Sequence, residues 1–108
     1  MAPAPKKDAE DAATTLVKLQ TEQFAYKYVV GLRPKNPFDG ESGKLDFEHY
    51  LKEFERAQSM PGLSAELRLG EYRFWWVGLA GLKVARFLLR KDVESAIEEA
   101  MEVLVSEF

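Results

Sequence analysis

The spacing of apolar positions predicts a helix that begins at Asp46, a residue that favours the N-cap position. Apolar side chains then recur at i, i+3, i+4 and i+7, which places them on one helix face. This face consists of Phe47, Tyr50, Leu51 and Phe54. Leu45 and Tyr50 stand at the N′ and N4 positions and are expected to form a hydrophobic staple. Residues 59–62, which include Pro61, end the helix.

A second helix is predicted from Ser64, as its N-cap, to about residue 77. It has two apolar stripes, with Trp75 between them. The stripes are Leu69, Tyr72, Trp76 and Leu79 on one side, and Leu67, Gly70, Phe74 and Val77 on the other. A helix that is apolar nearly all round must be covered on two sides. It is either the central helix of a small bundle, or one stripe meets a partner or the aromatic segment of residues 24–30.

Two further helices are predicted in the last third of the chain. A short helix over residues 80–89 is apolar and basic, with the side chains Lys83, Arg86, Arg90 and Lys91. Asp92 is expected to cap a final helix whose other face is acidic. The apolar stripe of that helix is Val93, Ile97, Ala100 or Met101, Leu104 and Phe108. We expect the core to contain Phe54, Trp76, Leu79, Ile97 and Leu104.

The N-terminal third does not have the pattern of an independently folded unit. Residues 1–11 combine proline, alanine and charge, which is typical of a flexible arm, and residues 12–23 are compatible with a marginal helix. In residues 24–32, Phe24, Tyr26, Tyr28 and Val30 alternate with other residues, and this period of two predicts extended chain. Residues 31–43 have the prolines and glycines of a loop.

These elements predict an all-α fold, a small orthogonal bundle of four or five helices preceded by a flexible or extended N-terminal arm. We divide the chain into an arm over residues 1–36 and a helical domain over residues 37–108. The chain stops at Phe108, on an apolar position of a helix, so we expect it to be a fragment of a longer protein.

Composition narrows the functional classes. The 108 residues include no cysteine and only one histidine, His49, so thiolate chemistry and cysteine-ligated or multi-histidine metal sites are excluded. The net charge of −3 argues against direct nucleic-acid binding. No apolar run approaches the roughly 20 residues that span a bilayer, and no signal peptide is visible. We therefore expect a cytoplasmic protein that is not an enzyme, needs no cofactor or metal, and contacts no membrane.

From Pro37 onward the sequence resembles the N-terminal domain of Gag capsid proteins from Ty3/Gypsy-type LTR retrotransposons. The resemblance is carried by Phe38, Gly40, Asp46, Phe47, Tyr50, Leu51, Phe54, Gly62, Ser64, Leu79, Gly81 and Phe87, and by the stripe of the last helix. The same part of the sequence is also similar to the N-lobe of Arc, a domesticated neuronal Gag protein. Lys83 and Arg86 depart from the family pattern, which has a small residue and often a tryptophan there. The chain lacks a zinc knuckle, so RNA packaging does not reside in this segment.

The resemblance implies a structural domain that self-associates in a capsid, together with a downstream capsid domain. The alternative is a peptide-binding adaptor whose apolar groove takes a hydrophobic peptide. We expect Phe24, Tyr26 or Tyr28 to cover Leu67, Phe74 or Val77, within one chain or by exchange between copies. The charged candidates for contacts between copies are Lys83 and Arg86 on the basic helix and Glu98 and Glu102 on the acidic one.

Overall fold

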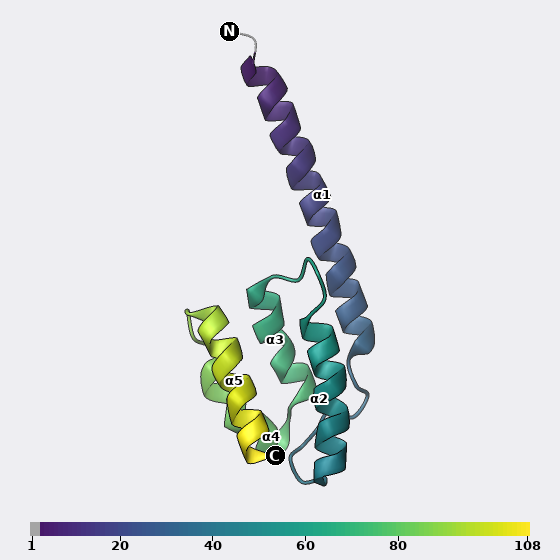
Figure 1. The fold of residues 1–108 in the computed structure, drawn as a ribbon, viewed down its shortest axis with the longest axis vertical. Helices are drawn as coiled ribbons and strands as arrows, with labels where there is room; N and C mark the ends of the chain where they lie inside the picture. The colour runs from purple at the N-terminus through teal and green to yellow at the C-terminus, as the bar shows by residue number, and fades with distance from the viewer. Residues whose placement is uncertain (1–2) are drawn as a thin grey trace.

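A computed structural model describes the backbone of residues 3–108 and the side chains of residues 16–108. Within this range the chain is all-α, as predicted, and its elements follow one another along the sequence (Figure 1). They are α1 (Pro3–Leu32), α2 (Lys44–Gln58), α3 (Ala65–Trp75), α4 (Gly78–Val84), the 3-10 turn η1 (Ala85–Phe87) and α5 (Val93–Glu107). The helical domain predicted from the apolar stripes therefore contains α2 to α5.

Residues 3–32 of the N-terminal arm form one helix, α1, so the extended chain predicted for residues 24–32 was wrong. The segment also has helical spacing, which the alternating aromatic residues made hard to recognise: Ala25 and Val29, four positions apart, are both fully buried. Tertiary packing of this small pair decides the conformation, and the larger aromatic side chains around it stay at the surface. Met1 and Ala2, part of the predicted flexible stretch, lie outside the described residues.

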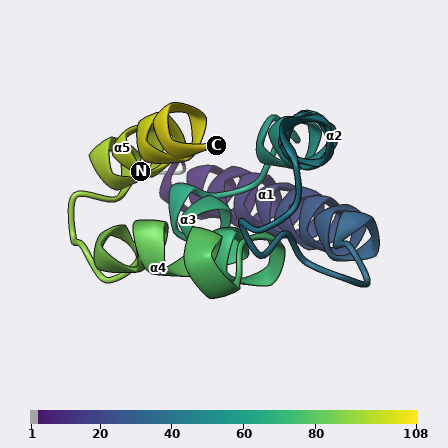
Figure 2. The ribbon, with the colours of Figure 1, turned by 90° about the horizontal axis from the view of Figure 1, so that it is seen from below.

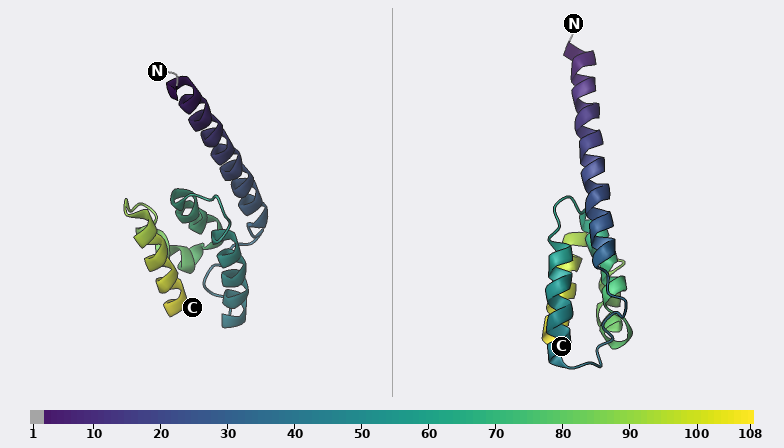
Figure 3. Two further views of the ribbon diagram at one scale, coloured as in Figure 1. Left: turned by 45° about the horizontal axis from the view of Figure 1, so that its top comes forward. Right: turned by 90° about the vertical axis from the view of Figure 1, so that its right-hand side faces the viewer.

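The bundle has two layers, with α2 and α5 on one side and α3 and α4 on the other (Figure 2). Helix α1 joins the bundle by its C-terminal end only and projects far beyond it (Figure 3). The molecule measures 65 × 26 × 16 Å, and its radius of gyration is 17.7 Å. A compact chain of this length has a radius of gyration of about 13 Å. The difference comes from the projecting helix, which at 30 residues is about 45 Å long.

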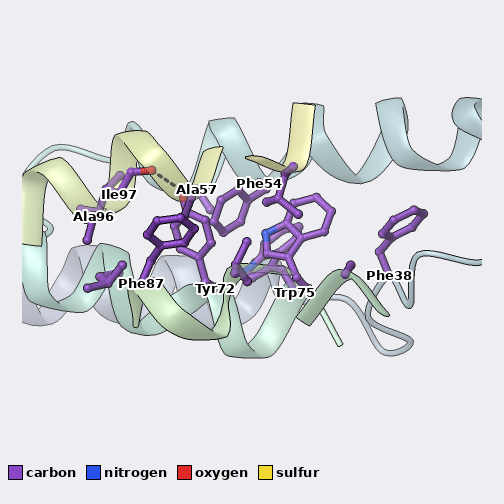
Figure 4. Packing of buried hydrophobic residues seen from close by; sticks show 14 of the residues in the cluster. Phe38, Phe54, Ala57, Tyr72, Trp75, Phe87, Ala96 and Ile97 are labelled. Carbon is purple, nitrogen blue, oxygen red and sulfur yellow. Dashed lines mark hydrogen bonds between the residues drawn. The ribbon is translucent and has the colours of Figure 1, made fainter. Parts of the chain in front are cut away.

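The core is aromatic and lies between the two layers (Figure 4). The ring of Phe54 on α2 packs against Tyr72, Trp75 and Trp76, with centroid distances of 4.7, 5.4 and 5.3 Å. The Tyr72 hydroxyl donates a hydrogen bond of 2.9 Å to the carbonyl oxygen of Ile97, which joins α3 to α5. Phe54, Trp76, Ile97 and Leu104 are buried as predicted.

Phe38 anchors the loop between α1 and α2 to the end of α3. Its amide donates to the carbonyl oxygen of Trp75 at 2.8 Å, and its own carbonyl accepts from the amide of Val77 at 2.9 Å. These bonds form a parallel β-bridge between Phe38 and Trp76. The Phe38 ring meets the rings of Phe47 and Trp76 at 5.6 and 5.8 Å. A loop residue of the capsid-like pattern is therefore part of the core.

The helix ends agree only in part with the prediction. The Ser64 hydroxyl accepts from the amide of Leu67, so Ser64 is the N-cap of α3 as expected. Asp46 is not the N-cap of α2: that position belongs to Gly43, and Asp46 lies in the first turn, where the helix dipole favours an acid. The predicted staple is also wrong, because Leu45 is among the most exposed apolar side chains.

Helix α3 ends at Trp75, two residues before the predicted end, and this displaces Leu79 from the core. Gly78 has a φ of +53°, a conformation that other residues rarely adopt, and a Cβ there would lie 3.1 Å from the carbonyl oxygen of Asp39. The chain therefore turns at Gly78 and begins α4. Leu79 loses the register of the α3 stripe and is 47% exposed, so its predicted burial was wrong.

Candidate self-association surfaces

The last turns of α1 are held on the bundle by small side chains and a tight turn. Ala25 and Val29 are fully buried. Higher along the helix, Thr21 faces the turn between α2 and α3, where a Cβ on Gly62 would lie 2.8 Å from the Thr21 Cγ2 atom. Gly62 has a φ of +88°, so both its conformation and its contact with α1 favour glycine. The arm and bundle are thus fixed to one another near residues 21–33.

A charged clamp completes this junction. The Arg33 guanidinium donates to both carboxylate oxygens of Glu71, from Nη2 at 2.5 Å and from Nε at 2.9 Å. Glu71 is almost fully buried on α3, and this hydrogen bonding raises the pKa of Arg33 above its usual value. The guanidinium also lies over the Phe74 ring at 3.6 Å and faces the Tyr26 ring at 6.0 Å. No local pattern in the sequence points to this pair, because its members are 38 positions apart.

The aromatic residues of the arm reach only part of the surface predicted for them. Tyr26 lies beside the second stripe of α3: it shares the Arg33 guanidinium with Phe74, and it lines a hollow of about 240 Å³ together with Leu67. Tyr28 faces α2 instead, where its hydroxyl accepts from Arg56 Nη2 at 3.3 Å. Val77 bonds to Phe38 through its backbone and is not part of this contact.

Large apolar side chains of α1 remain uncovered above the junction. Leu16, Val17, Leu19 and Phe24 are 57%, 62%, 49% and 68% exposed. Leu16, Val17 and Leu19 precede the junction at residues 21–33, in the part of the helix that projects from the bundle (Figure 3), whereas Phe24 lies within the junction on an exposed face. Phe24 is therefore placed away from its predicted partners on α3. An exposed run of this kind on one helix is a feature of interaction surfaces.

A second candidate surface lies between α4 and α5, and one of its cations, Lys83, has an ionic partner within the chain. Lys83 Nζ lies 3.6 Å from the Glu107 carboxylate. Arg86 and Glu102 line the same groove, of about 480 Å³. We had expected Lys83 and Arg86 to meet acids of neighbouring copies; for Lys83 the structure provides a partner in its own chain. Glu98 lies elsewhere, in a hollow that it shares with Arg68 and Met101.

The start of α5 is fixed by a small ionic network. The Arg90 guanidinium donates to the carboxylates of Asp92 and Glu99. Hydrogen bonding to Arg90 lowers the pKa of Asp92, and the same bond raises the pKa of Arg90. The Asp92 carboxylate therefore pairs with Arg90 and makes no side-chain cap bond to α5, although Asp92 occupies the N-cap position as predicted.

Two features are absent from the described part of the chain: a cluster of metal-ligating side chains and a helix suited to cross a membrane. Among the described residues, no three histidine or acidic side chains gather as metal ligands would. His49 lines a cleft of about 390 Å³ with Tyr50, Glu53 and Trp75. Of the helices between residues 3 and 108, none combines the length and the apolar character that a bilayer crossing requires.

The chain was compared with known protein families, proteins and structures. No protein-family model, no curated protein and no solved structure matches the chain. The resemblance to capsid domains therefore rests on the sequence residues named above. Function is inferred from the exposed surfaces of the molecule.

Proposed function

We propose that this chain is a structural self-association domain of the Gag capsid type, which contributes contacts between copies in a cytoplasmic particle. In this proposal the bundle is the capsid N-terminal-like unit and α1 is an association element attached to it. The domain carries out no catalysis and needs no cofactor. A domesticated Gag and an active element are equally compatible with it.

The observation that carries this proposal is the projecting half of α1. An isolated helix is marginal in water, because most helical stability in proteins comes from packing of an apolar face. Here Leu16 and Val17 are more than half exposed, and Leu19 borders only a hollow beside Leu67 of α3, whereas the bundle has a core of its own. A second copy of the chain would supply the missing cover.

Sedimentation equilibrium of the chain, from micromolar to millimolar concentration, tests this proposal. We expect the mean mass to rise above 12.3 kDa as concentration increases. Apolar contact through α1 predicts association that persists at high salt, whereas association by exposed charges weakens as salt screens them. A single monomeric species at every concentration and salt would contradict self-association.

A second candidate function, peptide binding, is favoured by the cleft beside Trp75. This cleft is lined by Leu32, Pro34, Tyr50 and Trp75 among others, and the buried Nε1 atom of Trp75 has no hydrogen-bond partner among the described residues. The cleft is also lined by Lys35, Asn36, His49 and Glu53, and an unpaired indole N–H beside such a mixed polar and apolar cleft would suit the carbonyl of a bound peptide. Titration with a library of hydrophobic peptides, followed by tryptophan fluorescence, tests it. Saturable binding by a monomer would favour this function over self-association.

A further inference from the structure

The exposed face of α1 has the spacing of a coiled coil. Five side chains recur at steps of 3, 4, 3 and 4 residues, and every one of them is exposed: Leu16, Leu19, Gln23, Tyr26 and Val30. The same spacing continues in the sequence back to Ala12 and Ala9. This is the a and d pattern of a heptad, with residues 16, 23 and 30 at a and residues 19 and 26 at d. The stripe covers about three heptads, or about 33 Å of helix.

This stripe is centred on another side of α1 than the stripe that holds the helix on the bundle, although Leu19, Gln23 and Tyr26 also border a hollow beside Leu67 of α3. The packed stripe is Glu22, Ala25, Val29 and Leu32, whose members are half-buried or buried. At 100° per residue, the two stripes are centred about 120° apart around the helix. A second helix can therefore lie along this stripe while α1 keeps its bundle contacts, and beside Leu19, Gln23 and Tyr26 it would also border Leu67 of α3. The two bundles would then lie on the outer sides of the helix pair.

The charges that flank the stripe favour one orientation. In this register Glu22 is at g and Lys27 is at e of the next heptad. A parallel pair brings g of one helix beside the following e of its partner, so Glu22 would meet Lys27 twice across the two-fold axis. An antiparallel pair brings g beside g, which would place acids together, since Asp8 is also at g. Neither Glu22 nor Lys27 has an ionic partner among the side chains of residues 16–108.

From this register we infer that two copies of the chain pair through α1 as a parallel two-stranded coiled coil. The inference rests on the proposed self-association and specifies its first step: a dimer in which both bundles lie at the same end. Gln23, a single polar residue at an a position, would meet its own counterpart and fix the two helices in register. The dimer would present two bundles side by side for any contacts through the α4–α5 groove.

Charge reversal tests both the partner and the orientation. We expect Glu22→Lys alone and Lys27→Glu alone each to weaken dimerisation, on the order of tenfold, because each sets like charges opposite one another. The double variant Glu22→Lys/Lys27→Glu restores the opposite charges and should dimerise like the parent. An equimolar mixture of the two single variants should form heterodimers. Equal dimerisation by all four proteins would overturn the inference.

Orientation has a direct second readout, because the chain has no cysteine. In a parallel, in-register pair each a residue faces its own counterpart. Leu16→Cys and Gln23→Cys, made separately, should therefore each form a disulfide-linked dimer under mild oxidation. An antiparallel pair has one self-facing level at most, so crosslinking at only one of the two positions would contradict the parallel arrangement.

A matched pair of apolar variants separates this inference from the general proposal. Leu16→Ser/Leu19→Ser removes side chains of the stripe and should weaken dimerisation more than about 100-fold. Val17→Ser/Phe24→Ser removes equally exposed side chains from another face of α1 and should leave dimerisation unchanged. If the parent associates and the first variant associates as strongly, the coiled coil is wrong but self-association stands. If the parent is monomeric throughout, both are wrong.

Discussion

The bundle and the arm are both helical, but they differ in where their apolar surface is covered. In α2 and α5 the apolar stripes are buried or half-buried inside the same chain, in the cluster that contains Trp75 and Trp76. In α1 only the last turns are buried, whereas Leu16, Val17 and Leu19 of the projecting part are 49–62% exposed. Equal helical structure therefore does not imply equal stability: the bundle has its packing partners within the chain, and in our proposal the projecting part of α1 finds its partner in a second copy.

The largest expected effect compares two phenylalanines, one from each region. Phe54→Ala leaves a cavity among three aromatic rings of the core and should lower the free energy of unfolding by about 3–5 kcal/mol. Phe24→Ala, on the exposed face of α1, should change it by less than about 0.5 kcal/mol. Urea unfolding of both variants under monomeric conditions measures the difference. Equal losses would mean that the two regions do not differ as described.

The next effect concerns the junction between the regions. Arg33→Met leaves the buried Glu71 carboxylate without its partner and should cost about 2–3 kcal/mol, a value reduced because Arg33 is partly exposed. The double variant Arg33→Met/Glu71→Gln removes both charges and should recover part of the loss. A double-mutant cycle by urea unfolding measures their coupling. Additive effects would show that the clamp does not join α1 to α3.

Within the bundle, capping sets a smaller effect. Ser64→Ala removes the side-chain acceptor for the Leu67 amide and should cost about 1 kcal/mol. Asp46→Ala, at the position that sequence analysis wrongly took for an N-cap, should cost less, because Asp46 contributes only through the helix dipole. Thermal unfolding of the two variants ranks them. A larger loss for Asp46→Ala would restore the original assignment.

The smallest effect is a pH dependence inside the core. Burial raises the pKa of Tyr72 above its ordinary value of 10.0, so the folded state favours the neutral phenol. This contribution is fully present below pH 10 and is lost as the pH rises through the folded-state pKa. Tyr72→Phe should cost about 1 kcal/mol at neutral pH, by loss of the bond to Ile97. The gap between parent and variant should then shrink above pH 10; a gap that stays constant in urea unfolding would contradict it.

Sequence reasoning worked where a pattern is local and regular. The stripes of α2 and α5 predicted buried faces at Phe54, Ile97 and Leu104, because period and burial coincide there. It failed in residues 24–32, because apolar side chains recur there both every two and every four positions, which fits a strand and a helix equally. The packing of Ala25 and Val29 on the bundle decides that the segment is helical. Sequence reasoning also placed Leu79 in the core, since nothing local shows that the helix turns at Gly78 first.

Among the contacts at the candidate surfaces, some were predicted from the sequence and others were not. That Tyr26 lies near Leu67 was anticipated from two unpartnered apolar segments, and both residues line one hollow. The clamp between Arg33 and Glu71 and the pairing of Lys83 with Glu107 were not, because ion pairs between distant segments depend on the folded arrangement of the helices. The heptad stripe of α1 is present in the sequence, but it can be recognised only once the segment is known to be helical.

Amide hydrogen exchange at low and high protein concentration tests most directly whether the two regions differ in where their stability comes from. Exchange is followed by mass spectrometry at micromolar and at millimolar concentration. We expect amides of residues 3–21 to exchange fast when dilute and to become protected as the concentration rises, while those of α2, α3 and α5 stay equally protected throughout. Protection of residues 3–21 that does not change with concentration would contradict the account.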